Sequence, residues 1–416
     1  TSSTVLSKTS TLPKRKRLHY SEPLVKSDYI KMMHFDKKSY LYRIIKVSAI
    51  VVTALLSVAL IYAAYSGTTH PADSRIAPVA VLAFPFLLAL EVMIGMLWLI
   101  VHSWRVSLIV WVAILISWPS VRVVAPLNMF PHTYTPKEDS TKFKVLTFNV
   151  ENFKVSYYGD KEKEFKAGQA TARYILKQDA DVVLLQEASL SADFNDLPFM
   201  DSLKKVYPYR DHGYHDQVIL SKHPYQPVID DSIKNGFASP DNFLNGYHFY
   251  ARAFDVLVPG HKVRFFNLHL HSIQLSNDDK QFYVDLTKLK TKDKPSEAKQ
   301  ASKTIFAKLT NAFRQHAQEA ALLRQVINQS DANVIVCGDF NDVPMSYAYR
   351  KIMGNDMTDA WVKCGFGPTA TYHNDRLFFK IDHVLYRGDM EAVEMHRHKE
   401  GSSDHYPLVT TFVWKR

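Results

Sequence analysis

Side chains that can move a proton stand at the ends of several apolar, strand-like runs in this sequence. Asp339 follows the apolar run 333–337, and its carboxylate could orient and deprotonate a water molecule. Asn341 stands two residues later, where its amide could hold that water in line for attack. These two residues predict a general base and its water at the end of one strand.

Glu187 and Asn149 close two earlier strand-like runs, and both side chains offer oxygen atoms. A hard divalent cation such as Mg²⁺ prefers oxygen ligands. Such an ion neutralises a phosphate group and the charge that develops on the leaving oxygen. We therefore expect these residues to hold Mg²⁺, or Mn²⁺ in its place, with a phosphate ester as the substrate.

Two histidines fit the same reaction. His405, if oriented by Asp382, could stabilise the pentavalent phosphorane or protonate the leaving group, and His269 could contact a phosphate oxygen. Taken alone, each residue has a more ordinary explanation, such as a strand-end hydrogen bonder for Asn149 or a satisfied, partly buried imidazole for a histidine. Six such motifs in order, each after an apolar run, are a poor match to chance. We therefore interpret them as one hydrolytic site.

The elements that must position these residues alternate between strand-like and helical patterns. Apolar residues at helical spacing predict helices over 161–177 and 296–328. The stretch 278–296 is lysine-rich and polar, and we interpret it as a solvated loop. Mixed strands and helices over about 280 residues favour a single large α/β domain. The expected strands are 142–150, 181–186, 217–221, 250–258, 262–270, 333–337, 381–386 and 408–414.

These motifs resemble those of the endonuclease/exonuclease/phosphatase superfamily. It includes pancreatic-type deoxyribonucleases, apurinic-site endonucleases, neutral sphingomyelinases and inositol polyphosphate 5-phosphatases. The two elements that are most specific together are Gly338-Asp339-Phe340-Asn341 and Ser403-Asp404-His405. The resemblance covers residues 142–413, and its other segments are 147–150, 185–187, 219–224, 267–270 and 381–385.

The resemblance implies a four-layer α/β sandwich of two packed, mixed β-sheets flanked by helices. It also implies a role for each site residue: metal binding by Asn149 and Glu187 with Asp404 near the metal, handling of the nucleophilic water by Asp339 and Asn341, and acid or stabilising action by Asp382 and His405.

Further segments are similar to a bacterial, membrane-anchored branch of the superfamily. They are 271–274, 346–349 and 365–369, together with the N-terminal apolar stretches. Two features depart from relatives. The segment 214–218 carries polar residues where small or apolar ones are common, and Lys380 stands where an arginine is common. Both departures bear on substrate contacts.

The N-terminal part of the chain has a different composition. Its first 43 residues hold ten Lys and Arg against three Asp and Glu. Of three apolar stretches that follow, the first two are long enough to cross a bilayer as helices, and Pro119, Arg122 and Pro126 interrupt the third. The expected organisation is a basic tail at 1–43, transmembrane helices at 44–65, 77–101 and 106–127, a linker at 128–141, and a catalytic domain at 142–416.

Charge predicts the membrane topology, because Lys and Arg next to a span stay on the cytoplasmic side. The basic tail sends the first helix out and the second back, and a third crossing then places the catalytic domain outside the cytoplasm. We expect this arrangement in a multi-pass protein of the bacterial inner membrane. If the third stretch only lies in the interface, the catalytic domain is cytoplasmic instead. Glu91, in mid-span, is a candidate functional carboxylate or a helix-packing residue.

The charge of the catalytic region bears on its substrate. Residues 131–416 hold 37 Lys and Arg against 36 Asp and Glu. Nucleic-acid affinity draws mainly on Lys and Arg contacts with phosphates, so this balance argues against long polyanions. Nucleic acid, a phospholipid head group and a small phosphometabolite all remain open, and no protein partner is indicated beside the lipid bilayer. A non-catalytic membrane binding protein on the same fold would have lost site residues, whereas this set is complete.

Overall fold

The computed structural model describes residues 40–128, 141–154, 160–188, 196–211, 216–228, 250–287, 295–374 and 378–415. The chain divides into two compact units, Thr1–Ala54 and Leu55–Arg416, and the boundary falls inside helix α2 (Tyr40–Ser66). The described part of the first unit is the first half of α2. Most of the expected basic tail and of the expected linker lies outside the described residues.

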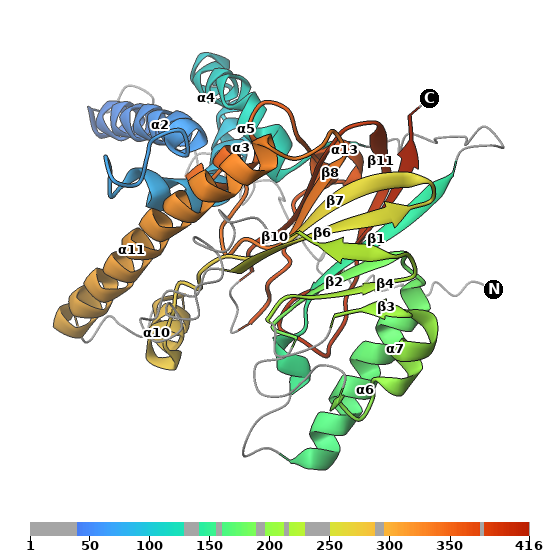
Figure 1. Cartoon of the computed structure of the whole chain (residues 1–416). Helices are drawn as coiled ribbons and strands as arrows, with labels where there is room; N and C mark the ends of the chain where they lie inside the picture. Colours follow the sequence, from blue (N-terminus) through green and yellow to red (C-terminus); the bar gives the residue numbers. More distant parts are fainter. Residues whose placement is uncertain are drawn as a thin grey trace, which may run out of the picture. The chain divides into compact units, whose positions relative to one another are not determined.

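Two mixed six-stranded sheets form the centre of the larger unit (Figure 1). Their strand orders are β11-β12-β1-β2-β4-β3 and β5-β6-β7-β8-β10-β9. Each sheet has one parallel pair, β1–β2 or β7–β8, among antiparallel neighbours. The strands are β1 (Lys142–Asn149), β2 (Val182–Gln186), β3 (Tyr209–Arg210), β4 (Val218–Ser221), β5 (Tyr225–Pro227), β6 (Tyr250–Val258), β7 (His261–His269), β8 (Val334–Asp339), β9 (Thr358–Asp359), β10 (Asp382–Arg387), β11 (Met390–Arg397) and β12 (Leu408–Trp414).

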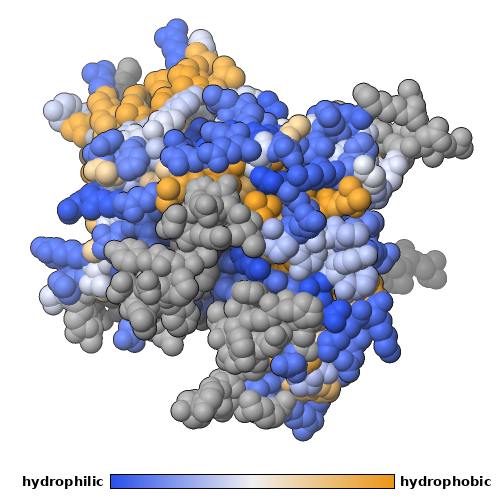
Figure 2. All heavy atoms as spheres, viewed as in Figure 1, coloured by the Kyte–Doolittle hydropathy of each residue, from blue (hydrophilic) through white to orange (hydrophobic). Residues whose placement is uncertain are grey.

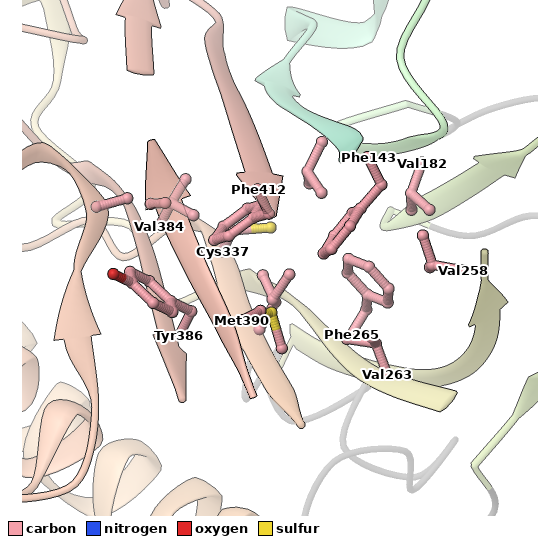
Figure 3. Close-up of a cluster of buried hydrophobic side chains, with 14 of the residues drawn as sticks. Phe143, Val182, Val258, Val263, Phe265, Cys337, Val384, Tyr386, Met390 and Phe412 are labelled. Atoms are coloured by element: carbon pink, nitrogen blue, oxygen red, sulfur yellow. The ribbon is translucent and has the colours of Figure 1, made fainter. Parts of the chain in front are cut away.

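Apolar side chains from both sheets form the core between them (Figure 3). Phe143 of β1 stacks on Phe412 of β12 with ring centroids 5.2 Å apart. Phe265 of β7 and Cys337 of β8 enter the same cluster from the other sheet. Successive strand residues face opposite sides of a sheet. Phe148 lies an odd number of residues after Phe143 on β1 and accordingly belongs to a different cluster, on the outer face of this strand.

Helices cover the two outer faces. Helix α6 (Lys161–Gln178) and helix α7 (Asp201–Val206) pack on the first sheet, and α11 (Pro295–Asn328) and α12 (Tyr347–Met353) pack on the second. The four-layer sandwich implied by the resemblance is therefore confirmed. Three short or peripheral elements complete this part: η1 (Glu151–Lys154), α10 (Asn277–Thr287) and α13 (Ala360–Cys364).

The expected strands and the two expected helices of the catalytic domain are present, with ends that differ from the prediction by at most two residues. Helix α2 begins four residues before the expected span 44–65. Strand β11 was not expected, because its charged residues at 391 and 394 interrupt the apolar pattern. The interpretation of 278–296 as a loop was wrong for its first part, which α10 occupies. Residues 288–294 lie outside the described part of the chain.

The N-terminal helices have the length and composition of membrane spans. Helix α2 has 27 residues and α3 (Ala77–Ile100) has 24, and both are long and apolar enough to cross a bilayer. Helices α4 (Trp104–Ile116) and α5 (Trp118–Val124) are bent by 68° at their junction. They are long and apolar enough to cross a bilayer only if the two helices form one span. Figure 2 shows hydrophobic side chains gathered over this region, where Leu97 and Leu115 are exposed.

Glu91 is fully buried among these helices. Ser57 Oγ of α2 donates a hydrogen bond to Glu91 Oε2 of α3 at 3.3 Å. A carboxyl group inside a helix pair is stabilised by such a bond, and this contact favours the helix-packing role.

Candidate active site

Three adjacent strands of the second sheet end side by side and carry three of the predicted site residues. In the β-ladder, Asp339 of β8 pairs with His269 of β7 on one side and with Asp382 of β10 on the other. A Cβ atom at Gly338 would lie 2.1 Å from the carbonyl oxygen of Leu268, and Gly338 has a φ of 132°. Only glycine permits this close approach of β7 and β8. Strand pairing therefore sets the spacing of the three side chains.

His405, in the loop before β12, lies between Asp382 and Asp339. Its Nδ1 is 2.9 Å from Asp382 Oδ2, and its Nε2 is 3.6 Å from Asp339 Oδ2. Burial alone would lower the pKa of His405, but the charges of Asp382 and Asp339 outweigh it and raise that pKa to about 10. His405 is therefore an imidazolium at neutral pH, and its Nδ1 donates to Asp382.

His269 forms a second pair, with Asp216. Its Nδ1 is 2.7 Å from Asp216 Oδ2, and its Nε2 is 3.6 Å from Glu187 Oε1 and 4.0 Å from Asp339 Oδ2. Burial would lower the pKa of His269, but these carboxylates, Asp216 first, raise it to about 10. Asp339 is thus flanked by two protonated histidines, each held by its own aspartate.

Asp216 was missing from the predicted site. The sequence contained a signal, since Asp216 belongs to the polar segment 214–218 that departs from relatives and stands just before an apolar run. Nothing local in the sequence pairs it with His269, 53 positions later. Tyr214 and His215 lie outside the described residues.

The carboxylate of Asp339 is buried, with 1% of the residue exposed. Burial raises its pKa, the charge of His405 lowers it and that of Asp382 raises it, and the result is a pKa of about 6. The backbone N–H of Asn341 donates to Asp339 Oδ1 at 2.8 Å, while the Asn341 side chain donates to the carbonyl oxygen of Leu270 at 2.9 Å. Asn341 therefore supports the base directly. Its contact with the attacking water stays a prediction.

Asn149 connects the two sheets at the site. Its Nδ2 donates to Glu187 Oε1 at 2.9 Å and to Asp339 Oδ2 at 3.1 Å. Its Oδ1 accepts from the backbone N–H of Glu151 at 3.0 Å. In this structure the amide is a donor between two carboxylates. A metal-ligand role for Asn149 requires a half-turn of the amide, so that its oxygen faces Glu187.

The loop 402–405 is tied to the end of β1. Ser403 Oγ donates to the carbonyl oxygen of Asn149 at 2.7 Å, and the backbone N–H of Asp404 donates to Glu151 Oε2 at 2.9 Å. Asp404 Oδ1 lies 4.0 Å from His405 Nε2. Ser403 and Glu151 were not predicted as site residues. They hold Asp404 at the edge of the site, beside His405.

Three residues of the site have a positive φ although none is glycine. These angles are 46° for Glu151, 50° for Glu187 and 47° for Asn341. Such backbone conformations are strained for residues with a Cβ and persist where the surrounding structure holds them, often at functional sites. Glu187 directly follows β2, and Glu151 and Asn341 stand two residues after the last residues of β1 and β8, so the strained positions lie where three strands end at the site.

Lys380, which departs from relatives, is a buried structural residue and is not placed to contact a substrate. Its side chain is buried, with Nζ 3.3 Å from Asp359 Oδ2 and 3.0 Å from His383 Nδ1. Its Nζ donates to both, while His383 Nε2 donates to the carbonyl oxygen of Asp342 at 3.0 Å. Lys380 therefore holds β10 against β9 and the chain after β8.

The charges around Asp339 fit a divalent cation. Five carboxylates, those of Glu187, Asp216, Asp339, Asp382 and Asp404, surround two imidazolium groups, those of His269 and His405. The cluster keeps an excess of negative charge, and oxygen atoms are the ligands that Mg²⁺ and Mn²⁺ prefer.

Two groups of atoms could hold such an ion. Asp339, Asp382 and His405 each offer one atom within 4.8 Å of the others. However, His405 Nδ1 is 2.9 Å from Asp382 Oδ2 and its Nε2 is 3.6 Å from Asp339 Oδ2, so a cation bound to His405 would have to displace one of these contacts. Glu187, on the opposite side of Asp339, is partly exposed and accepts from Asn149. The donor chemistry therefore favours a cation beside Glu187.

Comparison with known proteins gives a family match. Residues 146–405 match the profile of the Endonuclease/Exonuclease/phosphatase family, and residues 43–124 match a Domain of unknown function (DUF8431). No curated protein sequence matches the chain.

Solved structures with similar chain traces include truncated Caenorhabditis elegans TDP2, with 15% identity, a TM-score of 0.42, and coverage of 65% of this chain and 98% of that chain. D. rerio TDP2 complexed with a single-strand DNA product has 16% identity and a TM-score of 0.42, with coverage of 65% and 99%. The Bacteroides thetaiotaomicron mannosyl-6-phosphatase Bt3783 has 14% identity and a TM-score of 0.40, with coverage of 65% and 100%.

The newly identified partner of His269 gives a first prediction. Asp216→Asn should lower the kcat for phosphoester hydrolysis about 10- to 100-fold, because His269 loses the carboxylate that keeps it protonated beside Asp339. Steady-state kinetics of the full chain measure this. Asp179→Asn is the matched control, because that exposed carboxylate forms a surface ion pair with Lys222 at 2.6 Å. Equal kcat values for both variants would contradict the role of Asp216.

The pH profile gives a second prediction. Asp339 has to be ionised to act as a base, so kcat/KM should fall as the pH drops through the pKa of about 6, or lower when a bound cation adds positive charge. His405 has to be protonated, so activity should fall again near pH 10. Asp382→Asn removes the main charge that raises the pKa of His405 and should move this alkaline limb to lower pH. An alkaline limb that stays in place would contradict the pairing.

Proposed function

Because the chain belongs to the endonuclease/exonuclease/phosphatase family, matched over residues 146–405, we propose that it is a membrane-anchored phosphoester hydrolase that depends on a divalent cation, Mg²⁺ or Mn²⁺. The observation that carries this proposal is the position of the buried Asp339 carboxylate between two imidazolium groups, each of which is paired with another aspartate. Asp339 Oδ2 is 3.6 Å from His405 Nε2 and 4.0 Å from His269 Nε2. This arrangement joins a base for the attacking water to a proton donor for the leaving oxygen, with a second imidazolium that can contact the phosphate.

The residues divide the reaction between them. Ionised Asp339 accepts a proton from water, the water oxygen forms a bond to phosphorus, and the bond from phosphorus to the leaving oxygen breaks. His405 donates its proton to that leaving oxygen or stabilises the phosphorane, while His269 contacts a non-bridging phosphate oxygen. Glu187 and Asn149, with Asp404 nearby, would hold the divalent cation, which would supply positive charge to neutralise the phosphate.

The proposal also concerns the class of phosphoester that the enzyme hydrolyses. The near-neutral balance of residues 131–416 argues against a long nucleic acid as the main substrate. Attachment to a bilayer favours a phosphoester found at the membrane, such as a phospholipid head group, over a small phosphometabolite. A nuclease activity is the second candidate, favoured by the family description itself.

The contacts of the N-terminal helices support an extracytoplasmic catalytic domain. Arg314 Nε donates to the carbonyl oxygen of Pro71, in the turn between α2 and α3, at 3.3 Å. After α5, Asn128 Nδ2 donates to the carbonyl oxygen of Val362 at 3.0 Å. The α2–α3 turn and the chain after α5 therefore emerge on the same side as the catalytic domain. If α2 crosses the bilayer, its basic N-terminal side lies on the other face, which the charge rule makes cytoplasmic.

Hydrolysis by the full chain in nanodiscs tests the catalytic proposal. Wild type should hydrolyse bis-p-nitrophenyl phosphate with Mg²⁺, and Asp339→Asn should lower kcat by about 10²- to 10⁴-fold because the general base is lost. Glu187→Gln should raise the Mg²⁺ concentration needed for half-maximal activity. DNA, RNA, phosphoinositides and sphingomyelin as alternative substrates separate the substrate classes. Equal rates for wild type and Asp339→Asn would overturn the proposed function.

Reporter fusions test the topology. An alkaline phosphatase fused after Arg416 should be active, because this enzyme folds with its disulfides only outside the cytoplasm. A fusion after His102, in the turn between α3 and α4, should be inactive and serves as the control. Two inactive fusions would show that the third apolar stretch does not cross.

A further inference from the structure

The segment 342–350 follows Asn341 directly and leads from β8 into α12. On its inner side it is bonded to the catalytic domain at Asp342. The carbonyl oxygen of Asp342 accepts from His383 Nε2 at 3.0 Å, and its carboxylate oxygen Oδ2 lies 3.3 Å from Nδ1 of the buried His316. His316 Nε2 is 2.6 Å from the carbonyl oxygen of His271, so both nitrogens of this imidazole face acceptors. The start of the segment is thus fixed from two sides.

The outer side of the same segment packs into the N-terminal helices. Met345 is 1% exposed, and Val343 packs against the same cluster. This cluster joins the segment to four helices: α2 through Leu60, Ala63 and Ala64, α3 through Val81 and Phe84, α4 through Val110, Ala113 and Ile114, and α5 through Val121. The chain that leaves the catalytic strand is therefore buried in the membrane-side helices.

Gly67, the first residue after α2, touches the backbone of this segment. A Cβ atom at position 67 would lie 1.8 Å from the carbonyl oxygen of Met345, far closer than any real contact. The neighbour is backbone, which cannot move aside as a flexible side chain can. Glycine at position 67 is needed here for space.

Arg350 bonds the segment to the end of α2. Its Nε donates to the carbonyl oxygen of Met345 at 2.9 Å, and its terminal nitrogen donates to that of Ala64 at 3.4 Å. The last carbonyl groups of a helix have no partner within the helix. Ser120 Oγ of α5 donates to the same Ala64 oxygen at 2.6 Å. One carbonyl group at the end of α2 thus joins α5 and the catalytic segment.

We propose that Gly67 and Arg350 are positioning residues of the active site. Through them the end of α2 holds the segment 342–350, which in turn fixes Asn341, whose N–H donates to Asp339 at 2.8 Å. Both Asn341 and Met345 have a positive φ, 47° and 70°, and such strained residues need support from their surroundings. The N-terminal helices therefore do more than attach the enzyme to a bilayer. This inference rests on the proposed function for its catalytic consequence.

Two variants of the full chain in nanodiscs test the inference. Gly67→Ala and Arg350→Met should each lower the kcat for bis-p-nitrophenyl phosphate by about 10- to 100-fold, because small displacements of catalytic groups are costly. KM and the Mg²⁺ dependence should change little. Backbone amides of 339–350 should exchange hydrogen for deuterium faster, while those of α6 stay unchanged. Arg350→Lys keeps a donor and should recover part of the activity.

Ser107→Ala is the control within the helices. Ser107 Oγ donates to the carbonyl oxygen of Gly95 at 2.8 Å and accepts from Trp111 Nε1 at 3.0 Å, so the change disturbs α3–α4 packing and spares the segment. It should leave kcat and the exchange of 339–350 at wild-type values. Unchanged exchange in Gly67→Ala and Arg350→Met, or faster exchange with unchanged kcat, would overturn the inference. An inactive wild type would overturn the proposed function instead, and the exchange comparison would still decide whether α2 holds the segment.

Discussion

The buried carboxylate of Asp339 is the constraint around which the site is built. An ionised carboxylate removed from water is costly unless charges or hydrogen bonds compensate it. Here four groups compensate the charge: the imidazolium groups of His405 and His269 on either side, the Asn149 amide from the other sheet, and the backbone N–H of Asn341. Each histidine is kept protonated by a further aspartate, which adds negative charge at the margin. The cluster as a whole therefore favours an added cation, and such a cation would draw the phosphate of the proposed substrate to the same place.

Strand pairing explains why this cluster could be predicted in large part from sequence. Asp339 and His269 end their strands and Asp382 begins its strand, and strands that pair in register bring such positions together. The apolar runs also gave the positions of the expected strands, because alternation of buried side chains is a local property of a strand. Edge strands such as β11 carry charged residues and lose that alternation, so they gave no comparable signal.

Other features depend on contacts that no local pattern contains. Asp216 became a site residue only through its bond to His269, and Glu151 through its bond to the N–H of Asp404. The amide of Asn149 points its NH₂ group at two carboxylates, which residue type alone cannot tell. Lys380 was expected to bear on substrate contacts, but it is buried against Asp359 and His383. The packing of Met345 into the N-terminal helices likewise joins parts of the chain far apart in sequence.

We propose that Glu187 binds the cation, while Asp339 and the pair of Asp382 and His405 transfer protons. Crystals of the full chain soaked in Mn²⁺ test it directly, because the anomalous scattering of Mn²⁺ locates the ion. The account predicts a peak bonded to the Glu187 carboxylate, with the Asn149 amide turned so that its oxygen faces the ion, and a conserved 2.9 Å contact between His405 and Asp382. A peak bonded to His405 Nε2, between Asp339 and Asp382, would contradict it.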